Sequence, residues 1–303
     1  MKNKLIVLFI AALAVSFCAA VYPAVRADAA DAPDFGNALL KPEKEVVKKE
    51  KVYVPIIMYH MISSDVHISS LAVTPQQLES DLKYLSEKGY HAVFMSDIID
   101  FVYDNKPLPE NPIVLTFDDG YYNNYLYAMP LLEKYDMKMV LSIIGESADE
   151  WSAANWPANK RYGHLTWAQI CEMVKTGRVE LANHTYDMHK DGPRVGAAKK
   201  RGEDVESYKK ALSKDLLTFQ AQIKSKCGKA PECFTYPFGN KSDVSDEVLK
   251  ELGFKATLSC WGGVNNVVSG DKNCLYSMKR CNRTADRPVS SILQSLAKEM
   301  TEN

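Results

Sequence analysis

The stretch PIVLTFDDG at residues 112–120 carries the clearest structural signal in the chain. Its first part, Ile113 to Phe117, is a short apolar run of β-favouring residues between a proline and a glycine, which predicts a buried strand. Asp118 and Asp119 follow at the C-terminal end of that strand. Two adjacent carboxylates repel each other, so this placement favours a cation nearby. A solvated turn uses the same residue types, and the stretch alone leaves both interpretations open.

Predicted strands and helices alternate on both sides of this stretch. The hydrophobic patterns predict strands at 56–59, 92–94, 113–117, 139–144, 179–182, 233–236, 255–259 and 275–279, and helices at 75–89, 97–103, 123–135, 166–177, 205–223, 244–252 and 288–298. Pro130 is expected to kink the helix at 123–135, and residues 145–165 are expected to form a loop. This alternation predicts an α/β fold with a parallel sheet and outer helices, as an open doubly wound sheet or a barrel.

The start of the chain predicts export. Two lysines, a long apolar run and small residues up to Ala27 predict a signal peptide over residues 1–27, with an uncleaved membrane anchor as the alternative. Residues 28–51 are rich in Ala, Pro, Lys and Glu and are expected to form a flexible linker. Residues 52–303 then fit one large domain. We expect a secreted protein at the cell surface or cell wall, with membrane contact only if the leader is uncleaved.

Charge and cysteine content narrow the class of partner. The net charge of −1 argues against a nucleic-acid partner, which requires a basic excess. Six cysteines remain beyond the leader, and none forms a Cys-x-x-Cys pair. Six cysteines allow 15 pairings that the sequence does not rank. Their expected use is structural, as buried thiols or disulfides.

Several polar residues fall at the predicted ends of strands, where ligands of α/β folds bind. His60 ends the first strand, Asp118 and Asp119 end the third, and His184 follows the strand at 179–182. Tyr236 closes the strand at 233–236. These side chains are therefore expected on one rim of the sheet.

The spacing of His184 and His189 predicts a metal site only in a loop. On a helix, residues five apart point in very different directions, so these two rings can converge only if 185–188 is irregular. Asp119 with two imidazoles makes an O/N₂ ligand set that leaves positions open for water, as catalytic metals require. The adjacent Asp118 is then the expected base that takes a proton from water.

Three segments in the same order resemble the polysaccharide deacetylases, carbohydrate esterase family four: TFDDG at 116–120, HTYDMH at 184–189 and FTYPFG at 234–239. The opening PIIMYHMI at 55–62 resembles the branch of exported poly-N-acetylglucosamine and cell-wall deacetylases. The resemblance implies a distorted (β/α)7 TIM-like barrel, removal of acetyl from N-acetylated sugars, and a divalent metal. Zinc is the preferred metal, with nickel, cobalt or iron as alternatives.

The same resemblance implies roles for individual residues. Asp118 is the base, while Asp119, His184 and His189 are the metal ligands. The backbone N–H of Phe238 helps to hold the oxyanion.

The chain departs from the family pattern at three functional positions. Many members space the two histidines four residues apart, whereas residue 188 here is methionine and the partner is His189, as in the exported branch. The arginine that often precedes the Pro-aromatic-Gly turn is Thr235 here, and Arg280 or Arg283 is the possible replacement. The C-terminal histidine that often serves as general acid is also absent, because Leu275 is followed by Tyr-Ser-Met. His60 is the candidate that protonates the leaving amine or binds near it. Its alternative role is a hydrogen bond to a neighbouring strand.

Substrate contacts are expected from aromatic residues. Tyr236 and Trp261 are the chosen candidates, while Trp151 and Trp156 fit sugar stacking and ordinary packing equally well. His67, His91 and His164 are expected to have surface or structural roles.

Taken together, these assignments predict a monomeric N-deacetylase that acts on an N-acetylglucosamine-containing polysaccharide. The alternatives are an O-acetyl esterase acting on a xylan-like glycan and a glycan-binding pseudoenzyme.

Overall fold

The structure is a computed structural model that describes residues 49–65, 68–154 and 156–302. The predicted signal peptide and nearly all of the predicted linker lie outside these residues. β1 (Lys51–Tyr53) begins one residue before the predicted boundary at 52 and pairs antiparallel with β11 (Asn266–Val268). No helix within the described ranges has the length and apolarity needed to cross a membrane.

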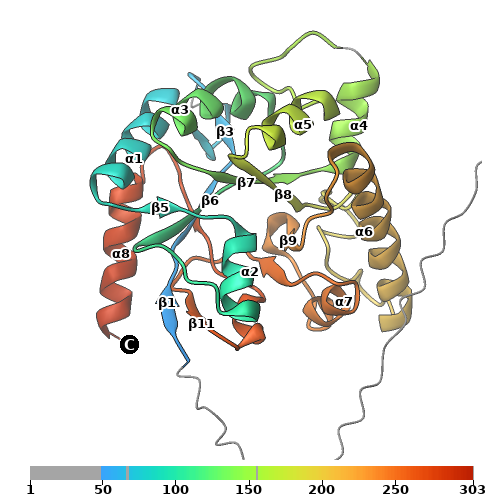
Figure 1. Ribbon diagram of the computed structural model, residues 1–303. Coiled ribbons are helices and arrows are strands. Elements are labelled where there is room, and N and C mark those ends of the chain that lie inside the picture. Colours follow the sequence, from blue (N-terminus) through green and yellow to red (C-terminus); the bar gives the residue numbers. More distant parts are fainter. Residues whose placement is uncertain (1–48, 66–67, 155, 303) are drawn as a thin grey trace, which may run out of the picture. The chain divides into compact units, whose positions relative to one another are not determined.

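The main sheet is parallel throughout and curls into a barrel surrounded by helices (Figure 1). Its strand order is β10-β9-β8-β7-β6-β2-β12, and β5 pairs with the beginning of β6. The bounds are β2 Ile56–Tyr59, β5 His91–Ala92, β6 Pro112–Phe117, β7 Met139–Ile143, β8 Val179–Asn183, β9 Cys233–Thr235, β10 Ala256–Leu258 and β12 Cys281–Asn282. A separate small parallel pair consists of β3 (Met61–Ile62) and β4 (Ala72–Val73). The predicted distorted (β/α)7 barrel is confirmed.

One late segment contacts both edges of the curled sheet. Met278 forms a parallel bridge with Leu258 of β10, and β12 a few residues later pairs with β2. The segment therefore spans the gap between the first and last barrel strands. Arg280 lies within it.

The described part of the chain contains eight α-helices, of which α8 follows the last strand. They are α1 Pro75–Glu87, α2 Met95–Asp104, α3 Met129–Lys134, α4 Gly145–Ala154, α5 Trp167–Lys175, α6 Val205–Cys227, α7 Ser245–Glu251 and α8 Val289–Glu302. Thr74 and Thr166 begin α1 and α5 as predicted, each in a reciprocal capping box with a glutamine three residues later.

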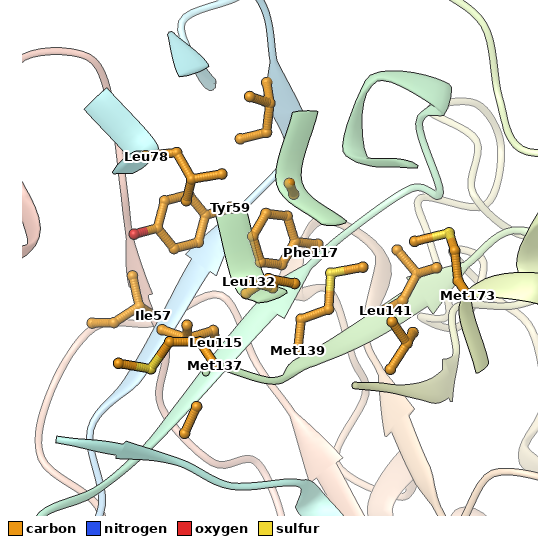
Figure 2. Close-up of a cluster of buried hydrophobic side chains, with 14 of the residues drawn as sticks. Ile57, Tyr59, Leu78, Leu115, Phe117, Leu132, Met137, Met139, Leu141 and Met173 are labelled. Atoms are coloured by element: carbon orange, nitrogen blue, oxygen red, sulfur yellow. The ribbon is translucent and has the colours of Figure 1, made fainter. Parts of the chain in front are cut away.

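The two sides of the strands have different partners, because successive side chains of a strand point to opposite faces. Outward-facing Ile57, Tyr59, Leu115 and Phe117 belong to one buried cluster with residues of α1, α3, α5 and α8 (Figure 2). Inward-facing residues of the same strands form a second cluster with α2, which comprises Ile56, Val114, Val140, Ala182, Cys233, Ile98 and Val102 among others.

The inward-facing row becomes polar towards the C-terminal ends of the strands. Along β6 it runs from Val114 to Thr116 and then to Asp118 just beyond the strand. Ser142 of β7 and Thr235 of β9 hydrogen-bond each other at 2.8 Å in the buried interior. The barrel is therefore apolar where α2 packs and polar beneath the site.

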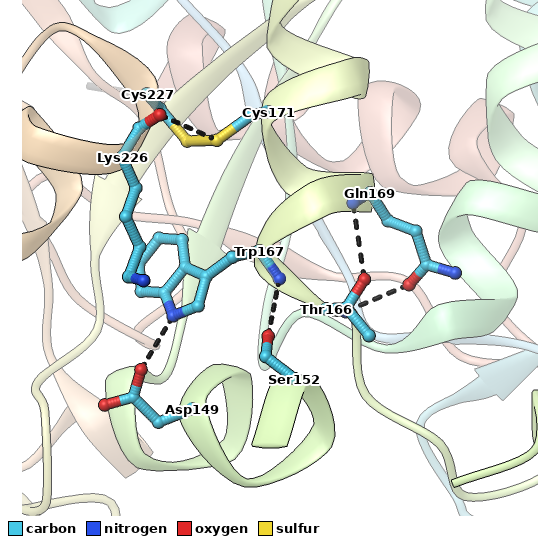
Figure 3. The surroundings of a disulfide bond; sticks show 8 residues. All are labelled: Asp149, Ser152, Thr166, Trp167, Gln169, Cys171, Lys226 and Cys227. Atoms are coloured by element: carbon cyan, nitrogen blue, oxygen red, sulfur yellow. Dashed lines mark hydrogen bonds between the residues drawn. A yellow bond between two sulfur atoms is a disulfide. The ribbon is translucent and has the colours of Figure 1, made fainter. Parts of the chain in front are cut away.

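A disulfide joins Cys171 of α5 to Cys227 at the end of α6, and the two cysteines are 56 residues apart in the sequence (Figure 3). Beside it, the Trp167 indole donates a hydrogen bond of 2.8 Å to Asp149 of α4. The outer helices α4, α5 and α6 are thus tied together on one side of the barrel. Among the described cysteines, Cys233, Cys260, Cys274 and Cys281 are free thiols.

Two predicted elements are wrong. Residues 145–165 are not all loop, because the Ala-containing segment at their start forms α4. A strand at 275–279 is absent, because Ser277 has a φ of 57°, which interrupts extended backbone; a 3₁₀ turn (Lys272–Leu275) and β12 flank it instead. The helix predicted at 123–135 is confirmed: helical backbone is continuous from 122 to 134, a π-helical segment (Asn124–Ala128) leads directly into α3, and Pro130 lies within this run.

Candidate metal and catalytic site

Three predicted ligands meet at the C-terminal ends of two barrel strands. Asp119 follows β6, His184 follows β8, and His189 reaches back from the loop beyond. Their ligand atoms all lie within 4.8 Å of one another. Asp119 Oδ1 is 3.4 Å from His184 Nε2 and 3.3 Å from His189 Nε2. The loop required by the five-residue spacing is therefore present.

The hydrogen bond made by Nδ1 of His184 determines whether Nε2, which faces Asp119, carries a proton or a lone pair. His184 Nδ1 donates to the carbonyl of Thr235 at 2.8 Å, because a carbonyl only accepts. In the neutral ring Nε2 is then the lone-pair nitrogen, and it faces a carboxylate oxygen. Asp119 Oδ1 is buried without a well-formed hydrogen bond. Lone pairs that face one another in this way fit a cation between them.

The proton affinities of the cluster support the same interpretation. Burial raises the pKa of Asp119, but His184 and His189 outweigh it and hold the pKa well below its ordinary value. Burial likewise lowers the pKa of His189, but Asp119 more than compensates, so that this pKa is raised. The cluster therefore favours positive charge at its centre, and an O/N₂ donor set suits zinc and similar divalent ions.

Asp118 points away from the cluster into a buried ion pair. Arg280 donates to both of its carboxylate oxygens, at 2.8 Å each, and also to Thr116 Oγ1 at 3.0 Å and the Ser259 carbonyl at 2.6 Å. The guanidinium is fully buried. Burial raises the pKa of Asp118, but Arg280 outweighs it, so the pKa lies below its ordinary value.

Of the two arginines proposed from the sequence, Arg280 therefore occupies the place beside Asp118. Arg283 instead pairs with Asp81 at 2.6 Å, in a network with the Tyr59 hydroxyl.

His60 lies among the same charged groups. Its Nδ1 is buried and has no hydrogen-bond partner. Burial lowers the pKa of His60, against the opposing effect of Asp118 and Asp119. The ring is thus a half-buried group with one buried, unused polar atom at the site.

His164 was expected to have a surface or structural role, and the structure gives it a structural contact with the backbone of Asp119. Its Nδ1 donates to the Asp119 carbonyl at 2.9 Å, and its ring stacks on Tyr121 with centroids 4.9 Å apart. Burial and the Asp119 carboxylate raise the pKa of Tyr121. Asp119 has a φ of 71°, so these contacts support a backbone conformation that is uncommon for residues other than glycine. No local motif marks His164, because it contacts the site across a 45-residue separation.

Of the two predicted substrate contacts, Trp261 is exposed and Tyr236 is buried. Trp261 is 67% exposed, and its carbonyl accepts from the backbone N–H of Arg280 at 2.9 Å. Phe238 is also exposed, and its ring lies 4.5 Å from that of His189. The prediction that Tyr236 contacts substrate is wrong, because its side chain is fully buried and its hydroxyl donates to Asp246 at 2.8 Å.

Comparison with known proteins agrees with the motifs. The sequence profile of the family described as polysaccharide deacetylase matches residues 105–257. The Bacillus subtilis protein YxkH, named as a polysaccharide deacetylase, is 31% identical over 229 residues, which cover 71% of this chain and 72% of that protein. The poly-β-1,6-N-acetyl-D-glucosamine N-deacetylase of Escherichia coli K12 is 27% identical over 221 residues, covering 65% of this chain. The match spans only 32% of that protein.

The fold has a counterpart among solved structures. The Streptococcus pyogenes deacetylase PplD matches with a TM-score of 0.65 and 20% sequence identity, over 82% of this chain and 99% of that chain. At this identity the likeness establishes a shared fold. The family profile and the match to YxkH confirm the family predicted from the motifs. The chain belongs to the polysaccharide deacetylase family.

Proposed function

We propose that the protein is an exported, metal-dependent hydrolase that removes acetyl groups from N-acetylglucosamine units of a cell-surface or cell-wall glycan. The observation that carries the proposal is the meeting of Asp119 Oδ1 with two histidine Nε2 atoms beside an Asp118 that Arg280 keeps ionised. The relatives named as poly-β-1,6-N-acetyl-D-glucosamine N-deacetylases motivate the substrate class.

The chain's own residues account for the proton transfers. Asp119, His184 and His189 would hold a divalent ion, which would supply Lewis acidity and lower the pKa of water at the site to about 7. Asp118 takes the proton of the attacking water, and its low pKa leaves it ionised for that purpose. His60 donates a hydrogen bond or proton to the departing amine. The backbone N–H of Phe238 stabilises the negative charge that develops on the acetamide oxygen.

Arg280 also bears on the alternative of a glycan-binding pseudoenzyme. That alternative was motivated in part by the absent family arginine. Arg280 supplies a guanidinium to Asp118 from a different position, so this part of the motivation is lost.

The test is acetate release from a panel of glycans, with and without a chelator. The panel comprises oligomers of β-1,6-linked N-acetylglucosamine, chitooligosaccharides, peptidoglycan and acetylxylan. We expect release from at least one N-acetylated glycan, loss of release with chelator, and recovery on adding zinc. Release from acetylxylan alone would instead identify an O-acetyl esterase, and glycan binding without any release would identify a pseudoenzyme.

Two classes of variant separate the metal ligands from the base. Asp119→Ala, His184→Ala and His189→Ala should each abolish metal binding and turnover. Asp118→Asn should retain the metal and lose a factor of about 10²–10⁴ in rate. A near-normal rate for Asp118→Asn would rule out its role as the base.

A further inference from the structure

The loop between the two histidine ligands contains a strained residue. Thr185 is fully buried with a φ of 71°, a conformation that is a genuine outlier for a β-branched side chain. Its hydroxyl oxygen is buried without a partner. Such a residue persists only where its surroundings over-determine the backbone. Contacts from the surrounding elements must therefore hold this loop in its conformation.

The central contact is a carboxylate from α6. Asp215 accepts hydrogen bonds from two successive backbone amides of the loop, from Tyr186 N at Oδ1 and from Asp187 N at Oδ2, both at 2.8 Å. Hydrogen bonds to an ionised acceptor are roughly twice as strong as neutral ones. The carboxylate is fixed in place because Leu212 and Leu216, one turn before it and next to it on α6, are fully buried.

Other elements hold the same loop from the opposite side. The side chain of Asn183 accepts from Thr185 N at 2.9 Å, and the first amide of α4, that of Gly145, donates to the Thr185 carbonyl at 3.1 Å. The Tyr186 hydroxyl donates to Asp149 of α4 at 2.9 Å. The packing is close, since a Cβ at Gly145 would lie 2.4 Å from the Tyr186 ring.

We propose that Asp215 is a positioning residue that holds residues 185–188 in the conformation in which His184 and His189 converge, before any metal is bound. The inference rests on the metal site of the proposed function. It adds one requirement to that function: the metal affinity of the site depends on the Asp215 carboxylate, which contacts neither the metal nor the substrate.

The direct test is the metal affinity of Asp215→Asn. The asparagine amide turns a donor towards one of the two backbone N–H groups, so one hydrogen bond is lost and two donors oppose each other. The matched control is Asp204→Asn, the same substitution at the N-cap of the same helix, where Asp204 accepts from Ser207 N at 2.8 Å. Asparagine caps helices as well as aspartate does, so the control should behave as wild type.

We expect Asp215→Asn to bind Zn²⁺ or Co²⁺ about 10–100-fold more weakly in competition with a chelator. The visible spectrum of the Co²⁺ form should also change, since it reports ligand geometry. A purely structural role would lower the unfolding temperature of the metal-free protein and leave affinity and spectrum unchanged at room temperature, which would overturn the proposal. Equal weakening in Asp204→Asn would overturn it as well.

A second measurement uses the metal-free wild-type protein and does not depend on how the variant folds. The amides of Tyr186 and Asp187 should be protected from hydrogen exchange without metal, and rapid exchange of both would contradict a preformed loop. Failure of the wild type to bind metal would remove the proposed function, whereas the exchange result would still decide whether the loop is preformed.

Discussion

Replacing Arg280 with methionine should move the pH dependence of catalysis. The change removes the guanidinium that binds both oxygens of Asp118 and leaves that carboxylate buried without a counter-charge. Breaking a buried ion pair by removing one partner costs about 3–5 kcal/mol. Since one pKa unit corresponds to 1.36 kcal/mol, this cost is equivalent to a rise of roughly 2–4 units in the pKa of Asp118.

The contribution of Asp118 to the pH dependence of stability has opposite signs in the wild type and the variant. In the wild type the folded-state pKa of Asp118 is lowered, so the pair contributes stability above the unfolded pKa and loses it as the pH falls through the folded pKa. In Arg280→Met the folded-state pKa is raised instead. The variant should therefore be least stable at neutral pH, relative to wild type, and should recover part of the loss as the pH falls.

The assay is kcat/KM for acetate release as a function of pH, because its acid limb reports the base of the free enzyme. We expect the acid limb of Arg280→Met to shift to higher pH by about 2–4 units, with Arg280→Lys shifting less because it keeps the charge and loses the two-pronged geometry. The matched control is Arg283→Met, which breaks the buried pair with Asp81. It should lose comparable stability and leave the acid limb in place. Coincident acid limbs for wild type and Arg280→Met would refute the assignment of Asp118 as an Arg280-controlled base.

Three further predictions concern residues around the site. Tyr236→Phe should cost about 1.5–3 kcal/mol of stability by removing the hydrogen bond to Asp246, with KM unchanged because the side chain is buried; a raised KM in a fully folded variant would restore its substrate role. Trp261→Ala should leave the unfolding free energy unchanged and raise KM for oligomers about fivefold, as loss of ~1 kcal/mol of ring contact implies, and an unchanged KM would remove it from the binding surface. Serine at both Cys171 and Cys227 should lower the unfolding free energy by about 4 kcal/mol in denaturant titrations, given the loop of chain that the disulfide closes, with kcat retained; a loss below 1 kcal/mol would argue against this account.

The strand-end residues could be predicted from the sequence because they depend on short-range patterns. A buried strand followed by Asp118-Asp119 and another followed by His184 are local signals, and parallel topology brings such ends to one rim. The sequence narrows the partner of Asp118 to two arginines but does not identify Arg280 as that partner, because the contact between Arg280 and Asp118 spans 162 residues. Only the barrel-closing segment brings the two together.

The errors have specific physical causes. Tyr236 follows directly after β9, and whether a residue there points to the rim or into the packing depends on strand parity and on the helix above it, which here supplies Asp246. The helix α4 was not predicted because two tryptophans and a proline within residues 145–165 suggested a surface loop. The first ten residues of this segment instead form a helix that packs against α5 and α6. The structural role expected of His164 holds, but its contact with Asp119 was not predicted because its partner is a backbone carbonyl, which no side-chain motif reveals.

The segment that spans the two edges of the sheet has a consequence for biosynthesis. Chains generally fold from the N-terminus as they emerge, so Asp118 is made well before Arg280. Until β12 pairs with β2, the carboxylate has no guanidinium and retains an ordinary affinity for protons. Closure of the barrel and ionisation of the proposed base are then one event, so a chain whose barrel is not yet closed can hold all three proposed metal ligands and still lack a competent base.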